Sequence, residues 1–421
     1  MKQLISALVL LSLSLCAAAQ VPAPNYDESK IPPYTLPDLL TTSKGRPVRN
    51  VRTWERVRRP ELLGLFEKEM FGISPGFLQG MHARVEKEVE NAFGGAGTLK
   101  EVTLFLDAAG NFPVHLLIAV PKGAKGPVPA FLGINFCGNH ATTFDPEVTI
   151  PGGKMPVHSG GTKVTEYERG ANAHRWPYEY ILSHGYAVVT YCREDIDPDF
   201  DDGFRNGVHG LMDGGKARDG SSWGTIAAWA WSLSRVLDYL YADPAIDADR
   251  VAVIGHSRLG KTALWAGATD PRFALVISND SGCGGAALSR RRFGETVAKI
   301  TTSFPHWFCK NFDAYGNNED ALPFDQHMLL ACVAPRALLV EGFDQGWFDT
   351  KGEYLAVKAA SPVWKFLGKK GMPDVEWPSD YDTSAIGPSL GYVRRAGEHG
   401  IAPIDWEWML DFAEGVWNKT K

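Results

Sequence analysis

The sequence predicts an α/β protein in which a mostly parallel sheet carries helices on both faces. Short, almost wholly apolar runs recur along the chain, as expected for strands that are covered on both sides. Stretches of helical length separate these runs, and strand–helix alternation of this kind builds a parallel sheet. A third observation is a segment of three alternating apolar and polar runs at residues 81–120, which predicts an antiparallel lead-in. The apolar runs are residues 128–136, 186–191, 251–254, 273–277 and 337–340.

The first 19 residues have the pattern of a secretory signal peptide. Lys2 precedes an apolar run at residues 4–15, and Ala17, Ala18 and Ala19 follow it. Such a run is too short to span a bilayer, and the small residues form a cleavage pattern. We therefore expect cleavage after Ala19 and a secreted or periplasmic protein.

The remainder of the chain, residues 20–421, is expected to form one domain, because it contains no internal repeat, low-complexity linker or charge block. Five prolines at residues 20–50 suit an extended strap that lies over the fold. Apolar residues then recur at helical spacing from 54 to 71, which predicts one amphipathic helix. The strap and this helix together occupy residues 20–80.

Composition and charge exclude several classes of partner. The 421 residues are 44% hydrophobic and 22% charged, and the formal net charge is −6, with no basic stripe. This balance argues against nucleic acid and anionic membranes as partners. Five cysteines would remain after cleavage, an odd and sparse set that is not a disulfide scaffold. Cys283 and Cys309 are the candidate pair for a single bridge.

The most informative segment is residues 251–261, where a buried strand runs into Gly255-x-Ser257 and a helix follows. A tight strand-to-helix turn of this kind exposes the serine hydroxyl and needs a small residue such as Gly255. The start of the helix offers N–H groups to a developing oxyanion. Leu259 replaces the second glycine of the usual pattern, and the alternative is a serine that caps the helix. The context favours an α/β-hydrolase fold with Ser257 as nucleophile.

A catalytic serine needs a base, and in this fold the order along the chain is serine, acid and then histidine. Three histidines follow Ser257. His306 stands in a crowded aromatic run and His327 opens an apolar helical stretch, so we interpret both as packed side chains. His399 lies in a loop just before the final helix, and it is the predicted base.

The acid that orients the base has two candidates. Asp344 follows the apolar run at residues 337–340, which is the position that this fold most often uses. Asp280 follows the preceding run. Either carboxylate could fix the imidazole tautomer and stabilise the imidazolium, and either could instead be a turn aspartate that bonds its own backbone. The sequence leaves both candidates open.

Two other segments carry weaker signals. Five aspartates occur at residues 195–202, but their spacing fails the EF-hand pattern and we interpret them as an acidic loop. The glycine-rich connection at residues 138–174 is long for a strand-to-helix link, which indicates that it is functional or mobile. No HExxH, Walker or GxGxxG pattern occurs, so neither a cofactor nor a metal is expected.

The motif Gly-x-Ser-Arg-x-Gly-Lys at residues 255–261 resembles the nucleophile turn of glucuronoyl esterases, carbohydrate esterase family 15. Further segments resemble the bacterial branch of that family, and together with the lead-in they cover nearly the whole mature chain; they are residues 279–291, 294–296, 304–309, 334–336 and 398–399. The resemblance implies a serine esterase that cleaves the ester between 4-O-methyl-glucuronic acid on xylan and lignin alcohols. Its expected partner is therefore a glucuronoxylan or lignin–carbohydrate ester, on which it would act as a monomer without a cofactor.

The same resemblance implies roles for four further residues. Arg258 matches the arginine that meets the oxyanion in this family, whereas its alternative is a salt bridge on the helix surface. Lys261 and Glu295 match residues that hold sugar hydroxyls, and Trp347 matches the indole that packs along the uronate. Their alternatives are solvated charges for the first two and core filling for the tryptophan.

The sequence also departs from the family pattern. Fungal members carry glutamate where this chain has Asp280, whereas other bacterial members use the acid that Asp344 matches. His256 stands where fungal enzymes have a cysteine, so their disulfide to the base loop is absent. Two other functions are compatible with the sequence: a xylan acetyl esterase, and a glycan-binding protein whose site is inactive.

Overall fold

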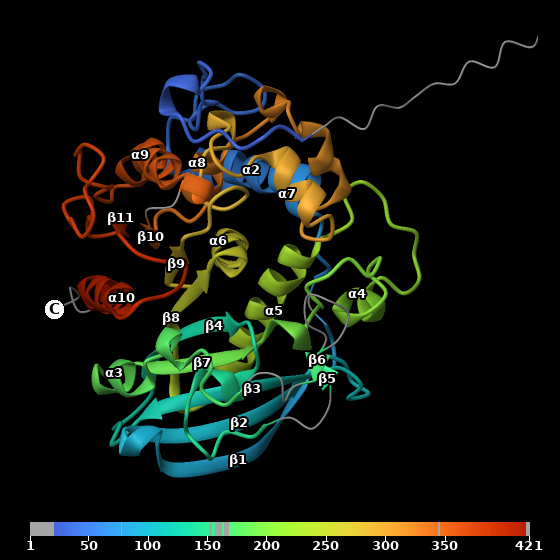
Figure 1. Ribbon diagram of the computed structural model, residues 1–421, viewed down its shortest axis with the longest axis vertical. Coiled ribbons are helices and arrows are strands. Elements are labelled where there is room, and N and C mark those ends of the chain that lie inside the picture. The colour runs from blue at the N-terminus through green and yellow to red at the C-terminus, as the bar shows by residue number, and fades with distance from the viewer. Residues whose placement is uncertain are drawn as a thin grey trace, which may run out of the picture.

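A nine-stranded mixed sheet forms the centre of the computed structural model, which describes residues 21–76, 78–150, 154–155, 162–163, 168–343 and 346–417 (Figure 1). The strand order is β1-β2-β3-β7-β4-β8-β9-β10-β11. The pairs from β1 to β7 are antiparallel, and those from β7 to β11 are parallel, so the predicted architecture is confirmed. The strands are β1 His82–Ala92, β2 Gly97–Phe105, β3 Pro113–Pro121, β4 Val128–Asn135, β7 Ala187–Cys192, β8 Ile246–His256, β9 Leu275–Asn279, β10 Ala337–Phe343 and β11 Leu390–Arg395, with a separate pair β5 Lys154–Met155 and β6 Thr162–Lys163.

Helices cover both faces of the sheet. One apolar core packs beneath α2, α5, α6, α8 and α9, and a second packs beneath α3 and α10 (Figure 1). Neighbouring residues of β4 enter opposite cores, Leu132 the first and Phe131 the second. A strand buried on both sides must be apolar at every position, which explains the continuous apolar runs. The helices are α1 Val51–Thr53, α2 Arg59–Phe66, α3 Tyr178–Ser183, α4 Gly207–Met212, α5 Thr225–Leu240, α6 Arg258–Thr269, α7 Val297–Ser303, α8 Gln326–Ala331, α9 Thr350–Phe366 and α10 Pro403–Trp417.

The N-terminal strap lies against a segment that follows β9. The Gly294 N–H donates to Asn25 O over 2.8 Å, and Arg291 forms an ion pair with Glu28. The ring of Tyr26 meets that of Phe293 edge-on, with centroids 6.3 Å apart. The strap therefore supports the chain immediately before Glu295 and ties it to the N-terminus.

The predicted helix at residues 54–71 is present as part of one continuous helical segment at residues 51–71. The α-helical turns of α1 and α2 alternate with two π-helical turns, Trp54–Arg58 and Glu67–Phe71. The segment ends at Gly72, whose φ is +86°, and an added Cβ there would lie 2.2 Å from the Trp223 Cα. Glycine is required because both the left-handed backbone and the close approach exclude a side chain.

Two expectations differ from the structure. Strand β11 was not predicted, because two arginines near its end interrupt the apolar pattern that marks the other buried strands. In the structure Arg394 forms an ion pair with Asp380 and Arg395 with Asp405, both over 2.8 Å. The prediction of a disulfide between Cys283 and Cys309 is wrong, since both residues are free thiols and buried. The Cys309 thiol faces a backbone carbonyl of the helical segment 51–71 instead. Among the described residues, no helix combines the length and apolarity needed to cross a membrane.

Candidate active site

The predicted nucleophile lies at a sharp turn between β8 and α6. Ser257 has φ +59° and ψ −125°, a strained conformation for a residue with a side chain. An added Cβ at Gly255 would lie 1.8 Å from Leu259 O, so only glycine permits the chain to double back. The Ser257 N–H donates to Asn279 O over 2.9 Å, which ties the turn to β9. Within the described part of the chain, the Ser257 hydroxyl makes no capping bond to α6, so the alternative of a helix cap is not supported.

His399 and Asp280 are hydrogen-bonded to each other. His399 lies between β11 and α10, and its Nδ1 bonds the Asp280 Oδ2. Asp280 directly follows β9, is 1% exposed, and has a left-handed backbone with φ +51°. Its N–H donates to Glu341 O over 2.6 Å, which fixes the turn against β10. Asp344, the other candidate acid, lies outside the described residues.

Aromatic contacts place the His399 ring beside the serine turn. The ring centroid lies 4.3 Å from that of His256, which directly precedes Ser257. The His399 ring also stacks on the ring of Phe348, with the two centroids 4.3 Å apart and 15° between the ring planes. Burial, followed by the positive charges of Lys261 and Arg175, lowers the pKa of His399. The imidazole is therefore neutral near neutral pH, which is the state that can accept a proton.

Arg258 is held by a carboxylate from the aspartate-rich stretch. Its Nη1 donates to Asp199 Oδ2 over 2.6 Å. That stretch is a loop, as expected, but Asp197 and Asp199 are buried in it, 3% and 1% exposed, and each accepts a hydrogen bond from another side chain. His306, interpreted as a packed side chain, is buried and bonds Asp199 through Nε2 at 3.0 Å. His327 is buried as expected, with Nε2 2.9 Å from a strap carbonyl.

The three residues with predicted roles in sugar binding lie near one another. Lys261 is buried and its Nζ donates to Ser281 O over 2.6 Å. Burial lowers the pKa of Lys261 and raises that of Glu295, and the charge of each residue opposes the shift of the other. The Glu295 N–H donates to Trp347 O over 2.9 Å. Trp347 is only partly buried, so core filling does not describe it, and neither Lys261 nor Glu295 is a solvated charge.

A second group of buried residues was missed by the sequence analysis. Asn279 bridges two neighbours: its Oδ1 lies 2.7 Å from His256 Nδ1, and its Nδ2 donates to Glu341 Oε2 over 2.9 Å. The Asn279 amide thus connects the strand of the nucleophile to β10. One signal in the sequence could have identified Asn279: it directly precedes Asp280, inside a segment that resembles the family.

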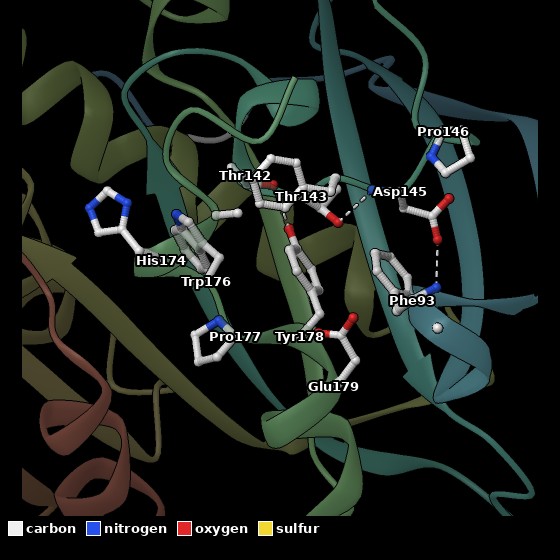
Figure 2. Close-up of a pocket in the computed structure, with 13 residues that line it drawn as sticks. Phe93, Thr142, Thr143, Asp145, Pro146, His174, Trp176, Pro177, Tyr178 and Glu179 are labelled. Carbon is white, nitrogen blue, oxygen red and sulfur yellow. Dashed lines mark hydrogen bonds between the residues drawn. The ribbon is translucent and has the colours of Figure 1, made fainter. Parts of the chain in front are cut away.

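A separate cavity of about 590 Å³ lies beside α3 (Figure 2). Figure 2 shows Tyr178 at its centre, between Trp176 and Phe93. Part of the glycine-rich connection lines it, including Thr142 and Asp145. None of the predicted site residues lines this cavity.

A serine at a strand-to-helix turn, beside a histidine that bonds a buried aspartate at the carboxyl edge of parallel strands, defines a hydrolase of the α/β-hydrolase fold. Residues 137–368 match the protein family described as "Glucuronyl esterase, fungi". The chain is 44% identical over 398 residues to carbohydrate esterase MZ0003 from an unknown prokaryotic organism, covering 93% of this chain and 91% of that protein. The chain therefore belongs to the glucuronoyl esterases of carbohydrate esterase family 15, and it is a carboxylic ester hydrolase.

Solved structures agree with this assignment. A glucuronoyl esterase from Solibacter usitatus superposes with a TM-score of 0.88 and 42% identity, covering 92% of this chain and all of that one. A promiscuous esterase of the same family, from a marine bacterial metagenome, gives 0.86 and 43%, covering 93% of this chain and all of that one. Both matches extend over more than nine tenths of this chain.

Proposed function

We propose that this protein hydrolyses 4-O-methyl-glucuronoyl esters, which link glucuronoxylan to lignin alcohols, with Ser257, His399 and Asp280 as its catalytic triad. The observation that carries the proposal is the hydrogen-bonded pair of the half-buried His399 and the buried Asp280, whose imidazole packs on the residue preceding Ser257. A relative from Schizophyllum commune, named 4-O-methyl-glucuronoyl methylesterase, is 30% identical over 83% of this chain and 80% of its own length. That relative supports the glucuronoyl ester as substrate.

The mechanism follows from the contacts of the three groups and from the neutral state of His399. The Ser257 hydroxyl attacks the ester carbonyl while neutral His399 accepts its proton through Nε2. Asp280 holds the imidazole through Nδ1 and stabilises the imidazolium that forms. The tetrahedral intermediate expels the alcohol, which takes the proton from His399. Water then attacks the acyl-enzyme by the same route and releases the free uronic acid.

The oxyanion is the point at which Arg258 acts. Negative charge develops on the former carbonyl oxygen, and N–H groups at the start of α6 are available to it because the turn precedes the helix. The Arg258 guanidinium adds a full positive charge to these dipoles. Losing a single oxyanion donor typically lowers kcat by a factor of about 10²–10³. We expect Arg258→Met to lower kcat by a factor of that size.

The sugar is held by groups that suit a polyol. Lys261 and Glu295 supply a donor and an acceptor, and the partly exposed indole of Trp347 supplies a flat apolar face. These groups would grip the uronate on the acyl side of the ester. A xylan acetyl esterase would place its sugar on the alcohol side, where they have no uronate ring to hold.

The test compares a methyl or benzyl ester of 4-O-methyl-glucuronate with acetylated xylan as substrates. We expect hydrolysis of the glucuronate ester, its loss in Ser257→Ala, and full activity in the surface control Ser183→Ala. Dominant acetate release would favour the acetyl esterase instead. An active Ser257→Ala variant would refute the nucleophile, and an inactive wild-type protein that binds glucuronoxylan would favour the glycan-binding function.

We also propose that the protein is exported. The leader expected at residues 1–19 lies outside the described residues, so the support is the sequence pattern alone. N-terminal sequencing of protein secreted by a bacterial host tests it. We expect the mature chain to begin at Gln20, and an intact Met1 in the exported fraction would contradict this prediction.

A further inference from the structure

Asp199 lies at the centre of a buried cluster that joins three segments of the chain, residues 193–199, the start of α6 and residues 306–307. Its Oδ2 accepts hydrogen bonds from two guanidinium groups, those of Arg258 and Arg193. Its Oδ1 accepts from the Trp307 indole N–H over 2.8 Å and lies 3.0 Å from His306 Nε2. Each carboxylate oxygen thus has two partners: Oδ2 has two arginines that lie far apart in the sequence, and Oδ1 has two adjacent residues. Such an arrangement fixes the orientation of the carboxylate as well as its position.

The orientation of Arg258 follows from this carboxylate. A guanidinium carries its N–H groups in one rigid plane, so an ionic bond at Nη1 sets the direction of all the others. The Arg258 guanidinium carbon also lies 4.8 Å from the centroid of the Trp307 ring, within the range of a cation–π contact. Trp307 therefore contacts both partners: it hydrogen-bonds Asp199 and packs against Arg258.

The support behind Trp307 is itself rigid. The first two N–H groups of α5 donate to the carbonyls of residues 306 and 307, Thr225 N to His306 O over 2.9 Å and Ile226 N to Trp307 O over 3.2 Å. The cluster is therefore anchored to a 16-residue helix. We therefore expect the Trp307 side chain to hold one position whether or not substrate is bound.

The charges of the cluster favour an anion at Arg258. Asp199 supplies one negative charge against the two positive charges of Arg193 and Arg258. Two further carboxyls lie near the arginines: Glu194, which bonds Arg193 Nε over 3.1 Å and whose pKa burial raises to about 8, and Glu295, whose pKa burial also raises and whose charge is matched by that of Lys261. Near neutral pH the cluster therefore carries a net positive charge, which the Asp199 carboxylate neutralises only in part.

We propose that Asp199 is a positioning residue that holds the Arg258 guanidinium in the direction of the ester oxyanion. This inference rests on the proposed function, in which Arg258 meets that oxyanion. It gives a role to the aspartate-rich stretch, of which Asp199 is the member that bonds the arginine. Asp197, two residues earlier, instead accepts from the Thr225 hydroxyl over 2.6 Å.

The experiment is a double-mutant cycle on hydrolysis of methyl 4-O-methyl-glucuronate ester. Asp199→Asn keeps the volume but turns one acceptor into a donor that faces donors, so Arg258 loses its anchor. We expect kcat to fall about tenfold to hundredfold, part of the loss of a full oxyanion donor, with KM within about twofold of wild type. In an Arg258→Met background the same change is expected to alter kcat less than about twofold.

A milder variant covers the case in which Asp199→Asn does not fold. Trp307→Phe removes the indole N–H to Asp199 and keeps an aromatic ring; we expect a smaller fall in kcat that also vanishes in Arg258→Met. Asp197→Asn is the matched control, because burial already raises the pKa of this carboxyl and favours its neutral form. We expect the control to retain wild-type kcat.

Three results would overturn the inference. The first is a wild-type kcat in Asp199→Asn, and the second is a loss that multiplies with that of Arg258→Met instead of vanishing. The third is a fully active Arg258→Met enzyme. The third result leaves the nucleophile untouched if Ser257→Ala is inactive, so failure of the inference and failure of the proposed triad are distinguishable.

Discussion

Replacing Asp280 by asparagine separates catalysis from stability. The carboxylate is 1% exposed and bonds His399 Nδ1 directly, so water cannot take its place. An amide neither fixes the imidazole tautomer nor stabilises the imidazolium. In enzymes with such a triad this change costs about 10⁴ in kcat, equivalent to about 5 kcal/mol of transition-state stabilisation. We expect a loss of that order in Asp280→Asn.

The same substitution is expected to leave the fold intact or stabilise it. Burial raises the pKa of Asp280, and the nearby carboxylate of Glu353 raises it further. A raised pKa means that the folded state binds the proton more tightly than the unfolded state does. The resulting stabilisation is present at low pH and is lost as the pH rises through the folded-state pKa. Because the amide does not ionise, its gain in Tm over wild type is expected to be larger at pH 8 than at pH 5.

The assay measures kcat on a methyl or benzyl ester of 4-O-methyl-glucuronate together with Tm at both pH values. Asp344→Asn is the matched control, since it changes the alternative acid in the same way. The reasoning fails if Asp280→Asn retains more than about one tenth of the wild-type rate. An inactive Asp344→Asn enzyme beside an active Asp280→Asn enzyme would assign the acid to the other residue.

Two further predictions concern the base and the turn. Because the pKa of His399 is lowered, we expect the acid limb of the pH profile of kcat to lie below pH 6.5. Lys261→Met removes a positive charge that lowers this pKa, so we expect the variant to move the acid limb to higher pH. A shift of the limb to lower pH would contradict the charge argument. Gly255→Ala forces a Cβ to within 1.8 Å of a backbone oxygen, so we expect it to lower the free energy of unfolding by about 3 kcal/mol or to prevent folding. Gly64→Ala, in a helix with open space around it, is the control and is expected to be neutral or stabilising in the same denaturant titration.

The sheet and the serine turn could be predicted because their signals are local. A strand covered on both faces is apolar at every position, and the turn needs glycine at 255 for steric reasons alone. Strand β11 could not be found in this way, since Arg394 and Arg395 are neutralised by Asp380 and Asp405, which lie elsewhere in the sequence.

The acid of the triad could not be decided from the sequence for a related reason. Strands β9 and β10 are parallel neighbours, with Ser278 opposite Val340 and Asn279 opposite Glu341. Because the carboxyl ends of parallel neighbours meet at one edge of the sheet, the sequence alone does not distinguish an acid after β9 from one after β10. The proposal of Asp280 rests on its bond to His399, which its left-handed backbone and its bond to the Glu341 carbonyl position, and none of these leaves a pattern in the sequence.

The strap at the start of the described chain has a practical consequence for anyone who expresses this enzyme. Tyr26 approaches the backbone at Gly346 so closely that an added Cβ there would lie 2.7 Å from its ring, and Gly346 directly precedes Trp347. A purification tag fused close to this end would lie near the residues proposed to hold the sugar, and shortening the chain past Glu28 would remove the ion pair with Arg291. Tags and truncations are therefore best made at the other terminus, beyond α10.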